Sequence, residues 1–253
     1  MSGLHALESA GLAGDPASPV HRLDARAKLL GLAGLTLVAA TAGSWPVLAG
    51  CAVLLTAVAL AARIPGAVIA RRALVILPVA LVAAASLPFV HDGGAEIAVG
   101  PLTASTAGLA IFGAAVGKAA VGTLSAILLA ATTTVPAALD GLRRLRVPAL
   151  LVAIAAVTWR YVFVVAAEVG RMRTALAARG HRTRHLLDGA TTGRLATALF
   201  LRAHARGERV HVAMAARGWA GVPPRASRAP LARADGAFAV VLAGVPAALA
   251  VAA

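Results

Sequence analysis

Cysteine and acidic residues are both scarce in this chain of 253 residues. The one cysteine, Cys51, lies within an apolar run; it excludes an intramolecular disulfide, and a zinc site would need further ligands. Asp and Glu number 10 against 24 Lys and Arg, which gives a formal net charge of +14. Such a charge suits either nucleic acid or the cytoplasmic face of a membrane. The positions of the basic residues therefore have to decide between these two partners.

The chain also lacks the short motifs of several enzyme classes. It contains no Walker lysine loop, no H-E-x-x-H pattern and no G-x-S-x-G pattern. Asp140-Gly141 and Asp188-Gly189 faintly resemble the centres of membrane phosphotransferases, but those centres need several acids on facing helices to hold a divalent metal. Each pair stands alone in a basic stretch, so we interpret both as turns. We expect no catalytic residue, no metal site and no cofactor bound by this chain.

Apolar residues are abundant, and their abundance indicates the fold class. The chain is 60% hydrophobic, whereas soluble domains average about 45–50% apolar residues. We therefore predict an all-α integral membrane protein. Of the 24 Lys and Arg, 17 lie between Arg143 and Arg233, where they flank apolar segments. Because cytoplasmic loops collect Lys and Arg, the expected partner is the lipid bilayer, and not nucleic acid.

Five transmembrane helices are predicted, with the N-terminus inside and the C-terminus outside. The loop 91–100 contains acids but no Lys or Arg, which is typical of an outside loop. The segment 64–72 is too short and too charged to cross, so we predict a surface helix there. Pro78 and Pro88 predict kinks in the span that follows. The predicted spans are about 29–44, 46–62, 73–90, 104–134 and 235–253.

The segment 149–167 is the main ambiguity of this topology. It is apolar enough to span, but a crossing would place the basic block after it outside, and Arg160 would cost about 2.5–3.5 kcal/mol in the bilayer. We therefore place it on the cytoplasmic side, continuous with the helix that follows, and keep a sixth span as the alternative. His181 and His185 in the next connector are interpreted as part of a basic patch, because no carboxylate or cysteine completes a ligand set. The expected domains are a flexible segment 1–20, transmembrane helices in 21–135, a cytoplasmic helical domain in 136–233 and a last transmembrane helix in 234–253.

Lys118 lies inside the predicted fourth span. This span is rich in Gly, Ala, Ser and Thr, which let helices approach closely. A lysine in the hydrocarbon region is costly, so Lys118 is a possible intramembrane functional residue. The alternative is that Gly117-Lys118 faces a cavity or another subunit.

One ten-residue pattern, R-x-x-x-A-[LM]-A-A-R-G, occurs in residues 171–180 and again in residues 209–218. Its residues favour helix, and Arg-Gly is the expected chemistry of a helix end, because the cation complements the dipole and the glycine accepts the left-handed conformation. A smooth alanine face tipped by one arginine suits a groove with an acidic or carbonyl-lined floor. Two copies predict two similar grooves. Four further positions on these helices would support the contact with such a groove, and they are Arg171, Ala175, Arg209 and Ala213.

These paired helices resemble the two Ala-Arg-Gly coupling motifs of the transmembrane T component of energy-coupling factor (ECF) transporters. The entry segment V-H-R-L-D-A-R-A-K, which begins at Val20, is similar to the amino-terminal signature of that family. So are L-R-R-L-R-V-P at 142–148 and the later Trp159-Arg-Tyr161 and Glu168. Ala25 departs from the pattern, since proline is common there, and its presence loosens the expected helix start. The resemblance covers residues 18–253.

The resemblance implies a subunit that neither hydrolyses ATP nor selects the substrate. A T component links a substrate-binding membrane subunit, of S or M type, to two cytoplasmic ABC-type ATPases. ATP and Mg are bound by those partner subunits. Each Ala-Arg-Gly helix end would dock in a groove of one ATPase. The implied docking residues are Ala178, Arg179, Gly180, Ala216, Arg217 and Gly218.

The segment S-P-V-H-R-L-D that begins at Ser18 looks most like the start of T components of cobalt or nickel uptake systems. In that family the metal is bound by another subunit. A T component of a vitamin ECF transporter is the alternative. An ordinary ABC permease would carry one coupling helix per half, not two in tandem. More distant alternatives are a basic integral-membrane enzyme or a scaffold, and a scaffold explains the charge but not the repeat.

Overall fold

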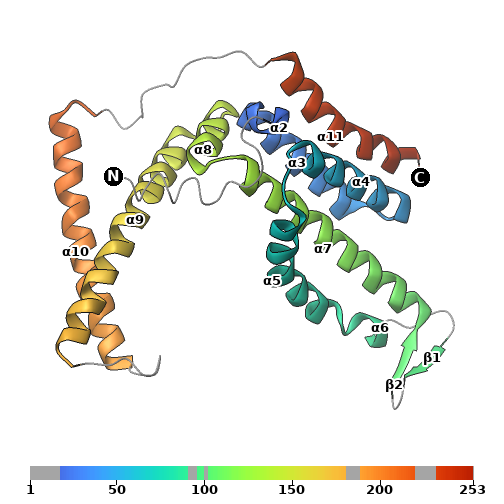
Figure 1. Ribbon diagram of the computed structural model, residues 1–253, viewed down its shortest axis with the longest axis horizontal. Coiled ribbons are helices and arrows are strands. Elements are labelled where there is room, and N and C mark those ends of the chain that lie inside the picture. Colours follow the sequence, from blue (N-terminus) through green and yellow to red (C-terminus); the bar gives the residue numbers. More distant parts are fainter. Residues whose placement is uncertain (1–17, 91–95, 100–101, 181–188, 220–231, 253) are drawn as a thin grey trace. The chain divides into compact units, whose positions relative to one another are not determined.

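The computed structural model describes residues 18–90, 96–99, 102–180, 189–219 and 232–252, and these ranges are mainly helical (Figure 1). This agrees with the predicted all-α membrane class. The chain divides into two compact units. The first unit comprises Met1–Gly141 and Ala229–Ala253, and the second unit comprises Leu142–Arg228.

The described part of the first unit starts with two capped helices, α2 (Pro19–Arg22) and α3 (Ala25–Thr41). The carboxylate of Asp24 accepts a hydrogen bond from the backbone N–H of Arg26 at 2.9 Å and so caps α3. The cap explains how α3 starts at Ala25 although proline is missing there. Helix α4 (Trp45–Ala61) follows, with a proline in its first turn.

Helix α5 (Gly66–Ala84) corrects one prediction. The charged segment 64–72 does not form a separate surface helix but runs on into the apolar stretch after it. The helix bends by 42° between its parts Gly66–Val75 and Leu77–Ala84. The bend lies beside Pro78, where the ring crowds the carbonyl four residues earlier, so this predicted kink is confirmed. Pro88 lies in a separate short helix, α6 (Leu87–Val90).

A small β-hairpin interrupts the helical pattern after α6. Strand β1 (Glu96–Val99) pairs antiparallel with β2 (Leu102–Ser105), with Ile97 opposite Ala104. The polar composition of this loop did not predict the hairpin. Ser105 then caps α7 (Thr106–Thr132) by accepting from the N–H of Gly108 at 3.1 Å.

Four further helices are α8 (Val135–Arg144), α9 (Ala149–Ala178), α10 (Gly189–Ala216) and α11 (Arg233–Ala252). Helix α9 confirms that the apolar segment after Pro148 is continuous with the first copy of the pattern. Asp140-Gly141 lies inside α8, so its interpretation as a turn was wrong. Asp188, His181 and His185 lie outside the described residues, and Gly189 begins α10.

Among the described residues, three helices are long and apolar enough to cross a membrane. They are α7, α9 and α11. The bent helix α5 would be a fourth. Helices α3 and α4 have 17 residues each, which is at the lower limit of about 17–25 for a span. Because α9 meets the same test, its placement on the cytoplasmic side, and with it the count of five spans, stays a prediction.

The core of the first unit lies between α3, α4, α7 and α11. Leu35, Leu55, Leu128 and Leu242 are almost fully buried in it. Cys51 is buried in the same cluster, which agrees with a packing role for this residue. Helix α11 packs most extensively on α3. A Cβ atom at Gly34 would lie only 2.8 Å from Cβ of Ala243, so glycine is what allows this approach.

Candidate functional site

The two copies of the ten-residue pattern end their helices in the same way. Helix α9 ends at Ala178 and α10 at Ala216, and the glycines that follow, Gly180 and Gly218, both have φ of +76°. Each glycine N–H donates to a carbonyl three residues earlier at 3.0 Å. The predicted left-handed glycine at each helix end is therefore confirmed.

The same positions of each copy are exposed and the same positions are partly buried. Met172 and Leu176 are half-buried in α9, and their equivalents Val210 and Met214 are half-buried in α10. These pairs are four residues apart, so each forms one stripe that packs inward. The alanine positions, both arginines and both glycines are exposed on the rest of the surface. The exposed residues are Arg171, Ala175, Ala178, Arg179, Gly180, Arg209, Ala213, Ala216, Arg217 and Gly218.

Glu168 joins α9 to α10. Its Oε1 lies 2.6 Å from Nη1 of Arg202 on α10, and its Oε2 accepts from Nη2 of Arg171, one turn further along α9. The pairing with Arg171 follows from the i,i+3 spacing. The pairing with Arg202 depends on how the two helices pack, so the sequence signals for Glu168 are its place in the family resemblance and the presence of an acid in a basic region.

The two copies differ in what surrounds their first arginine. Arg171 pairs with Glu168, whereas the residue three positions before Arg209 is another arginine, Arg206. Arg206 and Arg209 line a cavity of about 970 Å³ between α9 and α10. The rest of its lining is mainly apolar and includes Val157, Tyr161, Val165, Leu199, Val210 and Met214.

Lys118 of α7 forms a hydrogen bond with the end of α3. Its Nζ donates to the carbonyl oxygen of Ala40 at 3.0 Å. Ala40 lies in the last turn of α3, where carbonyl groups have no partner within the helix. A cation at a helix C-terminus is stabilised by the helix dipole. This contact supplies a structural role for Lys118, and a functional role stays a prediction.

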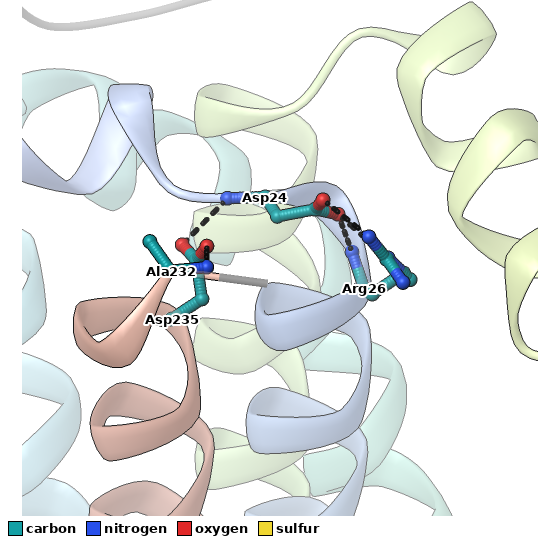
Figure 2. Close-up of polar contacts among 4 residues, drawn as sticks. All are labelled: Asp24, Arg26, Ala232 and Asp235. Carbon is teal, nitrogen blue, oxygen red and sulfur yellow. Dashed lines mark hydrogen bonds and ion pairs between the residues drawn. The ribbon is translucent and has the colours of Figure 1, made fainter. Parts of the chain in front are cut away.

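A second polar cluster lies where α3 and α11 begin (Figure 2). Asp235 is 7% exposed, and its two oxygens accept from the N–H of Asp24 and of Ala232, both at 2.9 Å. The carboxylate of Asp24 in turn accepts hydrogen bonds from the backbone N–H and from the guanidinium group of Arg26. The sequence offered one signal for Asp235, since an acid in the first turn of a helix is favoured by the dipole.

Lys28 completes this cluster just before the expected first span. It is 2% exposed, and its Nζ donates to the carbonyls of His21 at 3.2 Å and Thr132 at 2.9 Å. Burial lowers the pKa of Lys28 to about 8, although the carboxylates of Asp235 and Asp24 oppose this shift. Lys28 thereby ties the end of α7 to α2 and α3.

Within the part of the chain that the structure describes, no three His, Cys, Asp or Glu lie close enough together to hold a metal ion. The arrangement offers exposed cationic helix ends and a cavity lined by apolar side chains and arginines.

Comparison with known proteins identifies the family. The model of the CbiQ family, described as cobalt transport protein, matches residues 16–228. The cobalt transport protein CbiQ of Rhodobacter capsulatus is 48% identical over 92 residues. That alignment covers 35% of this chain and 37% of the relative, so the chain matches about a third of the relative's length. With its apolar helices and this family match over most of its length, the chain belongs to the CbiQ family of cobalt transport proteins and is a membrane protein.

Proposed function

We propose that this protein is the transmembrane coupling subunit of an ATP-driven importer of the ECF type, which takes up cobalt or nickel ions. It is not itself an enzyme. It transmits the movements of two ABC-type ATPases to a substrate-binding membrane subunit of S or M type. ATP and Mg are bound by the ATPases, and the transported ion by the membrane subunit.

The observation that carries this proposal is the equivalence of the two helix ends. Ala178-Arg179-Gly180 and Ala216-Arg217-Gly218 share sequence, backbone conformation and exposure. Two equivalent surfaces suit two partners with equivalent grooves, such as a pair of ATPases. An arginine that enters a partly desolvated groove makes charge-assisted, directional hydrogen bonds.

The cytoplasmic placement of the second unit is part of the proposal. Its basic residues favour the inside of a bacterial inner membrane, where ATP is available to the partners. Opening and closing of the ATPase pair would displace the ends of α9 and α10 relative to one another. The helices of the first unit would carry that displacement to the substrate subunit.

The test is co-purification of the tagged chain from its native host in detergent, followed by mass spectrometry. Recovery of ABC-type ATPases and a small membrane subunit supports the proposal. The metal that stimulates uptake by the recovered complex, with cobalt, nickel and a vitamin compared, decides the substrate. Recovery of a stable, monodisperse chain without ATPases would contradict the coupling role.

A further inference from the structure

The chain passes between the two units twice. The first unit ends at Gly141 and resumes at Ala229. Near each of these points, residues of the first unit contact the turn Asp24–Arg26 at the start of α3. This turn is called the entry turn below.

Gly141, the last residue of the first unit before the first connection, contacts the entry turn. A Cβ atom at Gly141 would lie 3.1 Å from Cδ1 of Leu29, 3.2 Å from Cβ of Ala25 and 3.3 Å from the backbone nitrogen of Arg26. These distances are shorter than most contacts of real side chains. Gly141 of α8 therefore lies directly against the entry turn, and the absence of a side chain at Gly141 permits this approach.

Asp235, which follows the second connection, also contacts the entry turn. Its Oδ2 accepts from the N–H of Ala232, the first described residue after the connection from the second Ala-Arg-Gly end, and its Oδ1 accepts from the N–H of Asp24 in the entry turn. Both distances are 2.9 Å, and Asp235 is buried. Figure 2 shows this carboxylate between the two backbone groups. A buried carboxylate with two N–H donors is a stiff connection, because breaking either bond leaves a charge less solvated.

The entry turn is well connected to the rest of the first unit. Helix α3, which it begins, packs on α11 and also on α7. One turn further along, Lys28 donates to the last carbonyls of α7 through Thr132. The entry turn is therefore connected to α3, α7 and α11 at their common end.

We propose that the entry turn is the anchor through which both connections of the second unit act on the membrane helices, with Gly141 and Asp235 as its positioning residues. This inference rests on the proposed coupling function. Neither residue touches an ATPase or the substrate in this proposal. Each determines whether a movement of the second unit is transmitted or lost.

The test uses the complete transporter complex in proteoliposomes and measures metal ions imported per ATP hydrolysed. Asp235→Asn keeps one acceptor oxygen and loses the charge, and Gly141→Ala crowds the contact with Ala25, Arg26 and Leu29, so that a neighbour has to shift by a few tenths of an ångström. We expect the ATPases to co-purify normally with both variants, while the import per ATP falls at least about fivefold. The matched control is Gly236→Ala, since a Cβ atom there meets nothing within 4 Å. Unchanged import per ATP in fully assembled Asp235→Asn and Gly141→Ala complexes would overturn the anchor.

A second measurement separates anchoring from simple helix association. Cysteines at Gly31→Cys and Leu242→Cys, in a Cys51→Ala background, would join α3 to α11 two turns away from Asp235. The ideal Cβ of Gly31 lies 3.3 Å from Cβ of Leu242, close to the range of about 3.5–4.5 Å in disulfides. If the disulfide restores import per ATP to Asp235→Ala, the carboxylate only holds two helices together and the anchor is refuted. If import per ATP stays low, the connection at Ala232 is what matters.

The two proposals fail in different ways. Absence of ATPases from the purified unmodified complex contradicts the coupling function. Presence of ATPases with normal import per ATP in the variants contradicts only the anchor.

Discussion

Oε1 of Glu168 lies 2.6 Å from Nη1 of Arg202, and this contact joins α9 to α10 across 34 positions of sequence. The same carboxylate holds Arg171 through its other oxygen. The ion pair therefore connects the helices that carry the two Ala-Arg-Gly ends. Loss of the connection should change how far apart those ends lie.

Glu168→Gln should broaden the distribution of distances between α9 and α10, because a neutral amide no longer attracts two guanidinium groups. The distances are measured by pulsed electron paramagnetic resonance between spin labels at Thr174→Cys and His211→Cys, with Cys51→Ala removing the native thiol. Glu208→Gln is the matched control, since Glu208 pairs only weakly with His204 on its own helix, at 3.9 Å. An equally narrow distribution in Glu168→Gln would show that the ion pair does not fix the helix separation.

Charge reversal at the helix ends should abolish binding of the ATPases. A charge-assisted hydrogen bond contributes about 1.5–3 kcal/mol, so Arg179→Glu or Arg217→Glu alone should weaken binding roughly tenfold to a hundredfold. The double variant should retain no ATPase in a pull-down while staying in the membrane. Arg173→Glu is the control, because Arg173 is exposed on α9 but lies outside the shared positions of the pattern. Normal pull-down by the double variant would refute the docking role.

Alanine at Gly180 or Gly218 should be unfavourable because of the backbone conformation there and not because of crowding. A Cβ atom meets nothing within 4 Å at Gly180 or Gly218, but both have φ of +76°. Gly180→Ala and Gly218→Ala should each cost about 1–2 kcal/mol at the helix end and weaken ATPase binding in a pull-down. Asparagine at the same positions should be tolerated better.

Gly170→Ala, in the same helix α9, should stabilise the protein, whereas Gly180→Ala should destabilise it. Gly170 lies inside α9 without a positive φ and without neighbours within 4 Å, so alanine there should stabilise by about 0.5–1 kcal/mol. Equal effects of alanine at Gly170 and Gly180 on thermal unfolding would contradict the conformational argument.

Lys118→Met should lower the melting temperature of the purified chain by a few degrees. The variant leaves the carbonyl of Ala40 without its donor, at a cost of about 1 kcal/mol. Lys118→Arg should restore most of the stability, because a guanidinium also donates to a carbonyl. Metal uptake should persist in both variants. Loss of uptake in a well-assembled Lys118→Met complex would show a role beyond this contact.

Labelling should place the second unit inside. In right-side-out vesicles, with Cys51→Ala as background, an impermeant maleimide should react with Glu96→Cys and not with Arg173→Cys. Both positions should react after the membrane is permeabilised. Reaction of Arg173→Cys from outside would mean that α9 crosses the bilayer and that the chain has a sixth span.

The sequence determined those features that depend on near neighbours along the chain. Arg-Gly at the end of each copy predicted two helix ends with left-handed glycines, because capping involves only the last turn of a helix. The 60% hydrophobic composition predicted a helical membrane protein, because the bilayer requires backbone groups to be satisfied within the segment. The kink at Pro78 is equally local.

Tertiary structure decided the features that depend on which helices pack together. Asp24 and Asp235 are 211 positions apart, and no local pattern links them. The close approach of Gly141 to Ala25 and Leu29 depends on tertiary structure, so the sequence alone made Asp140-Gly141 look like a turn. Lys118 looked like a charge without a partner until the end of α3 was placed beside it. For Asp235 and Lys118 the partner is a backbone group of another helix, which any residue type can supply, so residue identity carries no signal for the contact.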